Sequence, residues 1–319
     1  MPWKERYTVS DERTQEDVQW PDSGRCAFIV VIDPSPPCGP QGLGPAELDS
    51  DQAHYGLETA LPRMLDVLDA HRIRATFPVP AMLASQAPAL ARELVRRGHE
   101  VAAHGLRRED VSALEPHEEQ ARLARTTDII GEVIGERPRG WYTLPRQTDR
   151  FPGGALSTRT IGLLIDAGYD YLGNSQADDI PHYWVDDYPA RRAILALPYC
   201  YHHDDQYFIE YPPVWHGGNN LERVETLLRN WRGEFEAMRG TIEQPGFGRC
   251  FTMVVHPWLN GWGQRLDAFE QMLALSHNGP PVWNPTAGEC ARYWTGAYPA
   301  ATALKLAPSI WQDHPGSQG

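Results

Sequence analysis

Residues 26–33 read CAFIVVID, seven apolar residues in succession followed by an aspartate. An uninterrupted apolar run of this length is typical of a strand that is buried on both faces of a parallel sheet. The run ends at Asp33, because the prolines at 34, 36 and 37 cannot continue a strand. The sequence therefore predicts a central buried strand, a carboxylate at its C-terminal end, and a proline- and glycine-rich loop over 34–53.

Helical and strand patterns alternate along the rest of the chain. Apolar residues recur at helical spacing, which predicts helices over 57–70, 89–97, 116–134, 157–167, 221–239, 262–276 and 287–295. Short apolar stretches between them predict strands over 74–80, 100–103, 169–173, 193–198 and 250–256. Because strands that alternate with helices build parallel sheets with right-handed crossovers, we expect one barrel-like α/β domain over 25–300. Polar residues flank it, as an arm over 1–24 and a tail over 301–319.

The composition narrows the class of protein. Of the 319 residues, 41% are hydrophobic and 22% are charged, values close to those of soluble globular proteins. The longest apolar runs fall far short of the ~18 residues that span a membrane, and the N-terminus contains no apolar region of the secretory type. The five cysteines are scattered without a CxxC pair, which favours reduced thiols. We therefore expect a cytoplasmic protein with no membrane partner.

The net charge argues against nucleic acid as a partner. Lys and Arg together number 29 and Asp and Glu 42, which gives a formal net charge of −13 at pH 7. A chain this acidic repels phosphate backbones, and no run of basic residues compensates for it. The expected binding partner is a small molecule.

Three of the predicted buried strands end in an ionisable residue. FIVVI is followed by Asp33, EVAA by His104 and FTMVV by His256. In α/β barrels the C-terminal ends of the strands carry the working residues. A single polar residue at a strand end also arises simply because the chain leaves the core, but three such ends favour a functional cluster. The sequence therefore predicts that these three residues are catalytic.

Other motifs are excluded by their spacing. His99 and His104 are five residues apart in GHEVAAH, so on a strand they point to opposite faces and cannot share an ion. The glycines at 39, 42 and 44 fit neither GxGxxG nor the P-loop, and the chain contains no GxSxG nucleophile elbow. Because no nucleophile motif is present, water is the expected attacking group.

A series of ordered segments resembles one family over most of the chain, from Val18 to Phe269. The segments are QWPDSGRCAFIVVID (19–33), YGLETALPRMLDVLDAHRIRATFPVP (55–80), ELVRRGHEVAAHG (93–105), GERPRGWYT (135–143), DDIPHYW (178–184), LPYCYHHDDQYF (197–208) and VVHPWLNGWGQRL (254–266). They resemble the NodB-type polysaccharide deacetylase superfamily, carbohydrate esterase family 4, and within it the PuuE-type allantoinase branch with related cyclic-imide hydrolases. The resemblance implies a distorted (β/α) barrel, a catalytic domain over 25–300, and a homo-oligomer such as a tetramer.

The sequence departs from the family at the metal site. Metal-dependent members carry an aspartate pair after the first strand and two histidines at i and i+4, whereas this chain has Asp33 with Pro34 and His104 with Arg108. Proline offers no donor atom, and arginine is a permanent cation. We therefore expect no metal or other cofactor at the family position. Zn²⁺ or another divalent metal remains the alternative, with Asp33, His104 and His202 as its ligands. The other residues of the run His202–Asp205 offer further donor atoms.

A mechanism without a metal follows from the same residues. Asp33 is the expected general base, and His104 and His256 orient the substrate or protonate the leaving nitrogen. Arg108, at the vacated ligand position, is a candidate cation for the developing oxyanion, although it could equally be a surface arginine in the polar run RREDVS. Arg146 belongs to a loop that varies from the family pattern.

Substrate-binding residues are expected among the aromatic and polar positions of the matched segments. Tyr142 falls where deacetylases place an arginine that orients the base, and it could bond to a substrate carbonyl. Trp141 and Trp258 would form walls that suit a flat heterocycle or a sugar ring equally well, unless they only pack in the core. Asp178 and His202 complete the predicted set, and a polar pocket-lining role for His202 is favoured over metal binding.

Three functions are considered. The first is a hydrolase of a carbon–nitrogen bond other than a peptide bond, in a small cyclic amide, ureide or imide. The second is an N-deacetylase or deformylase of an amino sugar or another N-acyl compound, which would need an open groove. The third is a degenerate family member that binds a ligand or performs non-hydrolytic chemistry, an alternative that the altered ligand positions suggest.

Overall fold

The computed structural model describes residues 18–146, 149, 154, 156–187, 190–209, 223–240 and 249–303. Most of the predicted N-terminal arm and C-terminal tail lies outside these residues, as do the first two residues of the helix predicted over 221–239. Within the described part of the chain, no helix is both long enough and apolar enough to cross a membrane.

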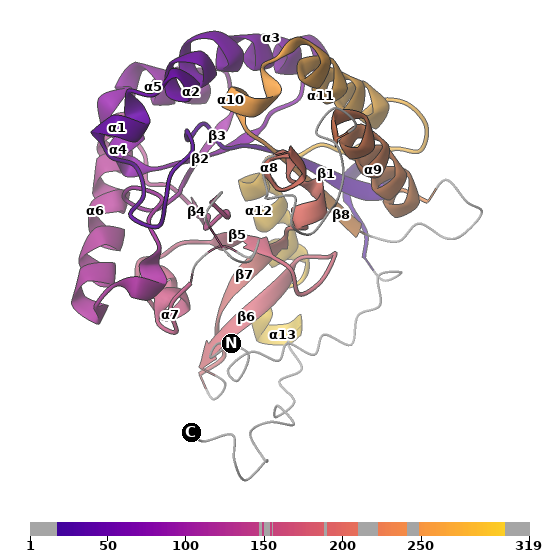
Figure 1. Cartoon of the computed structure of the whole chain (residues 1–319). Coiled ribbons are helices and arrows are strands. Elements are labelled where there is room, and N and C mark those ends of the chain that lie inside the picture. The colour runs from indigo at the N-terminus through magenta and orange to yellow at the C-terminus, as the bar shows by residue number, and fades with distance from the viewer. Residues whose placement is uncertain are drawn as a thin grey trace.

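One sheet forms the centre of the molecule (Figure 1). Its strands are β1 (Cys26–Ile32), β2 (Thr76–Val79), β3 (Glu100–Ala103), β4 (Gly140–Trp141), β5 (Tyr171–Ser175), β6 (His182–Asp187), β7 (Arg192–Pro198), β8 (Arg249–Val255) and β9 (Val282–Trp283). They lie in the order β6-β7-β5-β4-β3-β2-β1-β8, with β9 paired to β1. All pairs are parallel except β6 with β7.

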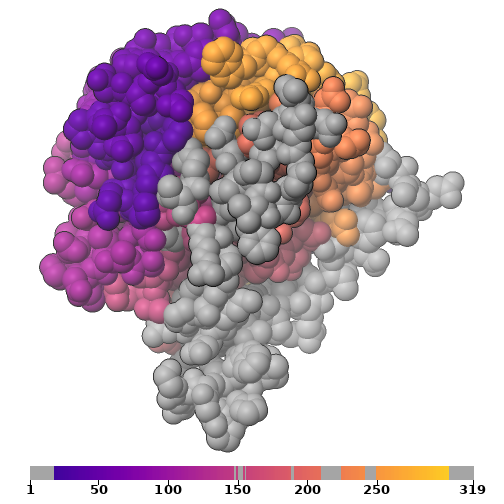
Figure 2. Space-filling model, viewed as in Figure 1, coloured from indigo at the N-terminus to yellow at the C-terminus, as the bar shows by residue number. Residues whose placement is uncertain are grey.

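Helices surround this sheet and connect its strands. They are α1 (Pro45–Leu48), α2 (Asp51–His54), α3 (Leu61–His71), α4 (Ala81–Gln86), α5 (Pro88–Arg96), α6 (Pro116–Ile134), α7 (Thr160–Asp166), α8 (Asp205–Ile209), α9 (Arg223–Met238), α10 (Pro257–Asn260), α11 (Gly263–Ser276), α12 (Ala287–Ala297) and α13 (Ala300–Ala303). Shorter turns are η3 (Pro21–Ser23), the π-helix η4 (Tyr55–Ala60), η5 (Val111–Ala113) and η6 (Tyr201–His203). Figure 2 shows that the indigo helices η4 and α3 lie beside the orange helices α10 and α11.

Side chains of the strands alternate between two apolar layers. In β1, Phe28 and its even-numbered neighbours belong to the outer layer, where Phe28 packs on Phe235 of α9 at 5.1 Å between centroids. Ala27, Ile29 and Val31 belong to the inner layer. Helix α12 closes the inner layer at the N-terminal ends of the strands, because Trp294 packs within it and the amide of Gly288 donates to the Glu100 carboxylate. Helix α12 therefore leaves the C-terminal ends of the strands uncovered, and this is where a functional site is expected.

The sheet curls until its two ends approach each other. The hydroxyl of Thr252 in β8 donates to the carbonyl of Pro198 in β7 at 2.8 Å, and the amide of Cys250 donates to the carbonyl of Asp179 at 2.8 Å. These contacts bring β8 to β7 across the open side of the sheet. The predicted α/β class with a mostly parallel sheet is confirmed, in the form of an incompletely hydrogen-bonded barrel.

Several local predictions were wrong. The loop expected over 34–53 contains α1 and most of α2. The helix expected over 57–70 is present, although its first part is the π-helix η4. Strands β4 and β9 were missed because two residues are too short to display an alternating pattern. Strand β6 was missed because its sequence HYWVDD mixes apolar and acidic residues, which its antiparallel place at the edge of the sheet allows.

Candidate active site

The three ionisable residues that end predicted strands lie together at one end of the barrel. Asp33 and His256 follow β1 and β8, whose register pairs Ile32 with Val255, and His104 follows β3. Each continues the inward-facing positions of its strand, because Val31, Ala102 and Val254 all belong to the inner layer. All three are buried, with at most 2% of their surface exposed.

One oxygen of Asp33 is the centre of the cluster. Its Oδ2 lies 3.1 Å from Nη2 of Arg108, 3.5 Å from Nε2 of His256 and 3.6 Å from Nδ1 of His104. Its Oδ1 accepts a hydrogen bond from the amide of Ser35 at 2.9 Å. The carboxylate is thus fixed by the backbone on one side and faces three donor groups on the other.

Asp33 is ionised despite its burial. Burial alone raises its pKa, but the charge of Arg108 and the nearby ring N–H groups of His104 and His256 outweigh this effect and hold the pKa well below its usual range. The side chain is therefore a carboxylate throughout the neutral range, and it can only accept hydrogen bonds or a proton.

His104 is held as a neutral imidazole of known tautomer. The amide of Leu144 donates to its Nε2 at 3.1 Å, so the proton of the neutral ring is on Nδ1 and faces Asp33. Burial lowers the pKa of His104 more than the charge of Asp33 raises it. His104 therefore orients groups near Asp33 and does not compete with it as a base.

His256 is held as a protonated imidazolium. Its Nδ1–H donates to Oδ1 of Asp205 at 2.6 Å, and its backbone amide donates to Oδ2 of Asp205 at 2.8 Å. Burial lowers the pKa of His256, but the carboxylates of Asp205, Asp33 and Asp204 raise it to about 10. The proton on Nε2 faces Asp33, which makes His256 a candidate proton donor.

Arg108 is part of the cluster and not a surface residue. It is 2% exposed, its Nη2 donates to the carbonyl of Pro145 at 2.9 Å, and Oε1 of Gln206 lies 3.5 Å away. Its backbone adopts a φ of 62°, in the left-handed region that residues other than glycine rarely occupy. The alternative of a surface arginine in RREDVS is therefore wrong.

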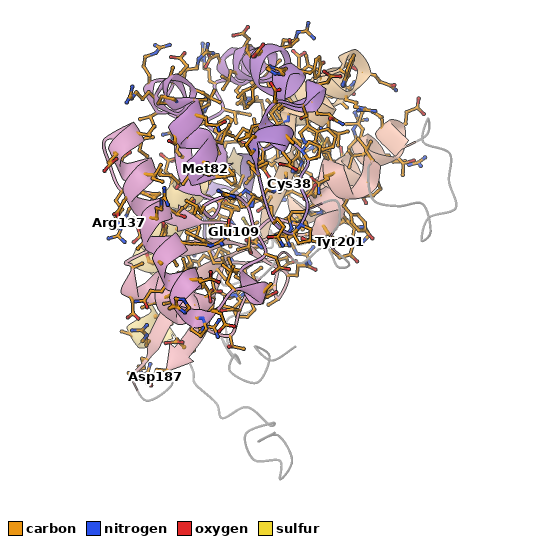
Figure 3. All side chains as sticks on the ribbon, turned by 60° about the vertical axis from the view of Figure 1, so that its left-hand side comes forward. Cys38, Met82, Glu109, Arg137, Asp187 and Tyr201 are labelled. Atoms are coloured by element: carbon orange, nitrogen blue, oxygen red, sulfur yellow. The ribbon has the colours of Figure 1, made fainter. Side chains whose placement is uncertain are left out.

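Two loops converge to place Arg108. The amide of Leu43 donates to the carbonyl of Arg107 at 2.7 Å, and the amide of Asp110 donates to the carbonyl of Pro40 at 2.8 Å. In Figure 3, Cys38 and Glu109 mark these two loops, which follow β1 and β3. A Cβ on Gly42 would lie 2.3 Å from the carbonyl oxygen of Arg107, and Gly42 also has a φ of 76°, so only glycine fits at this crossing.

The residues at the family's metal position do not fit a metal ion. The guanidinium of Arg108 lies against the carboxylate oxygen that would be a ligand, and like charges in a buried site repel each other. A second group, Asp204, Asp205 and His256, has ligand atoms within 4.8 Å of one another. There, however, His256 presents a proton to Asp205 rather than a lone pair, and the amide of Asn260 also donates to Asp205.

The alternative ligand set of Asp33, His104 and His202 is not brought together, which corrects that expectation. The ring of His202 packs on Tyr201 at 4.2 Å between centroids, beside a cavity of about 550 Å³. His203 packs on Phe251 at 4.3 Å, on the outward face of β8. The turn η6 therefore directs both histidines away from Asp33.

The predicted substrate-binding residues divide between two cavities. Trp141 and Tyr142 line a small cavity together with His104 and Arg108, and the ring of Trp258 lies 6.3 Å from that of His256. Asp178 and His202 line the other cavity, the one of about 550 Å³, which shares no lining residue with the first. Trp141 also packs edge-on against Tyr169 in the core.

Several buried polar atoms of the cluster have no hydrogen-bond partner among the residues that the structure describes. They are Oδ2 of Asp33, Nδ1 of His104, Nε and Nη1 of Arg108, and Nε2 of His256. Buried polar groups are nearly always paired in folded proteins, so a concentration of unpaired ones indicates a place where a polar ligand binds. This arrangement presents several donors and one charged acceptor to such a ligand.

Sequence reasoning included Asp205 only in an alternative set of metal ligands, and it did not assign Gln206 and Ser35 to the site. Asp205 reaches His256 because Asp204 forms a β-bridge with Val254, next to the end of β8. The only sequence signal was the segment LPYCYHHDDQYF, where two adjacent aspartates stand beside two histidines. A local pattern does not say which of the four faces the barrel interior.

Comparison with known proteins gives the fold of the chain and a family match over part of it. The family described as polysaccharide deacetylase matches residues 49–172. The structure resembles that of a PuuE allantoinase with a TM-score of 0.75 at 21% identity, covering 91% of this chain and 96% of that one. It resembles a putative polysaccharide deacetylase from Mycobacterium smegmatis with a TM-score of 0.75 at 24% identity, covering 94% and 99% of the two chains. The distorted barrel that the sequence resemblance implied is confirmed.

Curated relatives carry deacetylase names. A peptidoglycan deacetylase-like protein of Gibberella zeae is 24% identical over 256 residues, which are 72% of this chain and 73% of that protein. A chitooligosaccharide deacetylase of Bradyrhizobium sp. is 46% identical over 107 residues, which are 34% of this chain and 46% of that enzyme. Residues 49–172 therefore match the polysaccharide deacetylase family, whose members hydrolyse carbon–nitrogen amide bonds, and the whole chain shares the fold of the allantoinase and deacetylase structures.

Proposed function

We propose that this protein hydrolyses a carbon–nitrogen bond in a small cyclic amide, ureide or imide, with water activated by Asp33 and without a resident metal. The observation that carries this proposal is the buried Asp33 oxygen that faces Arg108, His104 and His256 at 3.1 to 3.6 Å. Amide hydrolysis needs a proton acceptor, a charge for the oxyanion and a proton donor, and the cluster offers one group for each.

Asp33 is the proton acceptor in this mechanism. A water molecule bound at its unpaired Oδ2 attacks the substrate carbonyl and transfers a proton to the carboxylate as the carbon–oxygen bond forms. In the free protein the low pKa of Asp33 makes it a weak base. As the carbonyl oxygen becomes negative it draws the charge of Arg108 to itself, and the basicity of Asp33 rises while the proton is transferred.

Arg108 stabilises the oxyanion. Its Nε and Nη1 are buried and have no hydrogen-bond partner within the described part of the chain, whereas its Nη2 is held by Pro145 and Asp33. Two donors on one fixed cation are thus available without breaking the contacts that hold it. In a buried site a positioned cation stabilises developing charge far better than it would in water.

His256 protonates the leaving nitrogen. Its proton on Nε2 faces the cluster, and Asp205 holds the opposite nitrogen at 2.6 Å. As the carbon–nitrogen bond breaks, the nitrogen takes this proton, and the proton on Asp33 restores the starting state after the ring-opened acid leaves. Asp205 fixes the ring and stabilises its positive charge.

The enclosure of the cluster favours a small substrate. Asp33 and His256 have no exposed surface and His104 and Arg108 have 2% each. The cavity beside His104 and Arg108 has a free volume of about 10 Å³, the space of a single water. A cyclic substrate does not fit this cavity in the free protein, so its binding requires the walls to move apart. The similarity to a PuuE allantoinase structure supports a cyclic ureide.

A deacetylase of an N-acyl compound is the second candidate. It is favoured by the 46% identity to the chitooligosaccharide deacetylase of Bradyrhizobium sp. over 107 residues. The same three groups would cleave an acetamide, with acetate as the product. The burial of the cluster argues for a small N-acyl compound over a polymer chain.

The test is a substrate panel with the wild type and Asp33→Asn. We expect ring opening of hydantoin-like or imide compounds and a loss of about 10²- to 10⁴-fold in kcat in the variant. Asp69→Asn is the matched control, because Asp69 is an exposed carboxylate on α3 that pairs with Arg97 at 2.8 Å, and it should change the rate less than about twofold. Release of acetate from N-acyl compounds without ring opening would replace the proposal with the second candidate.

Metal analysis tests the proposal that the mechanism is independent of a metal. Protein purified without added metal or chelator should contain less than stoichiometric metal, and its activity should survive EDTA. Stoichiometric zinc together with EDTA-sensitive activity would refute the metal-free mechanism. Ligand-induced thermal stabilisation without any product would indicate a binding protein instead of an enzyme.

A further inference from the structure

Arg108 adopts a left-handed backbone conformation, which residues other than glycine rarely occupy. Its φ of 62° brings the side chain of a residue other than glycine close to its own backbone. Such conformations persist only where surrounding contacts determine them, and they concentrate at functional sites. The side chain of Arg108 reaches Asp33 from this backbone, so whatever holds the backbone also positions the cation.

Arg146 is the side chain that holds this backbone. Its Nη1 donates to the carbonyl oxygen of Arg108 at 3.2 Å. Its Nε and Nη2 both donate to Oδ1 of Asp149, at 3.0 and 2.7 Å, and its backbone amide donates to Oδ2 of the same carboxylate at 2.9 Å. Arg146 is 3% exposed, and all three of its side-chain nitrogens are used in these contacts.

The residues beside Arg146 hold the other parts of the cluster. The amide of Leu144 donates to His104 at 3.1 Å, and the carbonyl of Pro145 accepts from Arg108 at 2.9 Å and from Nε2 of Gln206 at 3.1 Å. Three successive residues therefore contact the cluster, two through their backbone and one through its side chain. Arg146 is the only one of the three whose contribution depends on residue type.

Arg146 itself is not arranged to bind a substrate. Its positive charge is matched by Asp149 at 2.7 Å, with Asp110 at 3.5 Å, and its donors point at protein acceptors. We infer that Arg146 is a positioning residue that, anchored by Asp149, keeps Arg108 in its left-handed conformation and its guanidinium on Asp33. The kinetic part of this inference rests on the proposed function, and its structural part does not.

Loss of Arg146 should release Arg108. Without the bond to its carbonyl, residue 108 is expected to move to negative φ, and its guanidinium then leaves Asp33. The groups that face Asp33 are Arg108, His104 and His256, and removal of the first of them raises the pKa of Asp33. The acid limb of the pH profile of kcat/KM therefore shifts to higher pH, a change that a general loss of stability would not produce.

The experiment compares Arg146→Gln with Arg122→Gln. Arg122 contacts Glu109 in the same loop at 3.3 Å and does not contact Arg108, so its variant removes an equal charge without the carbonyl bond. We expect Arg146→Gln to lower kcat by about 10- to 100-fold with a smaller change in KM, and Arg122→Gln to change kcat less than about twofold. In an Arg108→Met background, Arg146→Gln should cause no further loss.

Crystal structures of the variants test the inference without turnover. The structure of Arg146→Gln should show residue 108 at negative φ and its guanidinium away from Asp33. A positive φ with the contact to Asp33 intact, an unchanged acid limb, or an equal loss in the Arg108→Met background would each overturn the inference. If the wild type hydrolyses no amide, the proposed function fails, and the φ of residue 108 still decides the role of Arg146.

A second variant covers the case in which Arg146→Gln does not fold. Asp149→Asn keeps the shape of the anchor and removes its charge. This variant should shift the acid limb of the pH profile of kcat/KM in the same direction by a smaller amount, and the melting temperature of the protein should not change. A fully active Asp149→Asn enzyme with the wild-type pH profile would overturn the anchoring role of Asp149.

Discussion

His256 carries its proton because of one neighbour, Asp205. Two hydrogen bonds join the pair, at 2.6 and 2.8 Å, and neither residue is exposed. Burial would by itself make the imidazole neutral, so the protonated form depends on the carboxylates around it, of which Asp205 contributes most. The ring of His104, in contrast, accepts from the amide of Leu144 at 3.1 Å, and burial keeps it neutral. Two histidines of equal intrinsic chemistry therefore have different charges.

Asp205→Asn is predicted to move the alkaline limb of activity. In the wild type the pKa of His256 is raised to about 10, so the proton donor is present below that pH and lost as the pH rises through it. Asparagine removes the main charge that raises this pKa, and the alkaline limb of kcat/KM should shift by more than about one pH unit toward neutrality. A pH–rate profile of the variant measures this shift. An alkaline limb that stays in place would mean that His256 is not the proton donor.

At the level of elements, the turn after β8 is shaped by close packing against η4. A Cβ on Gly261 would lie 2.1 Å from Cβ of Ala60, and one on Gly56 would lie 3.1 Å from the backbone of Trp258. Two glycines on facing elements thus let the π-helix approach α10. Helix α10 in turn carries Asn260, whose amide donates to Asp205. The packing of η4 on α10 therefore helps to hold Asp205 in place, and Asp205 in turn keeps His256 protonated.

Gly261→Ala is predicted to destabilise the protein. Its φ of −71° allows alanine, so the cost comes from the contacts of the new Cβ with Ala60 and with the carbonyl oxygen of Pro257 at 3.0 Å, and overpacking of this kind costs about 1–3 kcal/mol. Urea unfolding of the variant measures the change in the free energy of unfolding. Gly263→Ala is the control, because nothing lies within 4 Å of a Cβ at that position. Equal stabilities of the two variants would show that η4 and α10 do not pack as described.

At the level of the whole molecule, a helix closes one end of the barrel and the candidate active site lies at the other end. Helix α12 closes the N-terminal ends of the strands, where Glu100 and Thr76 accept from the amides of Gly288 and Ala287. The C-terminal ends of β1, β3 and β8 then supply the cluster, as in other α/β barrels. The contact of β8 with β7 completes the wall and brings Asp205 beside His256.

Thr252→Val is predicted to weaken this closure. The hydroxyl of Thr252 donates to the carbonyl of Pro198 at 2.8 Å, and Thr252 is buried. Valine keeps the shape and loses the hydrogen bond, at a cost of about 1 kcal/mol in the free energy of unfolding. Thr295→Val is the control, since its hydroxyl bonds only within α12. Thermal and urea unfolding measure both variants, and equal values would mean that the bond to Pro198 does not stabilise the barrel.

The sequence determined the alternating elements and three of the residues in the cluster. Buried strands have local signatures, since uninterrupted apolar runs such as Cys26–Ile32 report burial on both faces, and the first polar residue after such a run lies at the strand end. Asp33, His104 and His256 follow from this reasoning alone. Short or mixed strands such as β4 and β6 carry no such signature, and they were missed.

The tertiary structure decided which residues meet and with what charge. Asp205 and His256 are 51 residues apart in the chain, and their contact depends on how far the sheet curls, which no local pattern records. The same holds for Arg108, whose left-handed backbone and contact with Asp33 depend on Pro145 and Arg146. Protonation of a buried group is set by its neighbours in space, and the chemistry of this site was therefore fixed only by the folded chain.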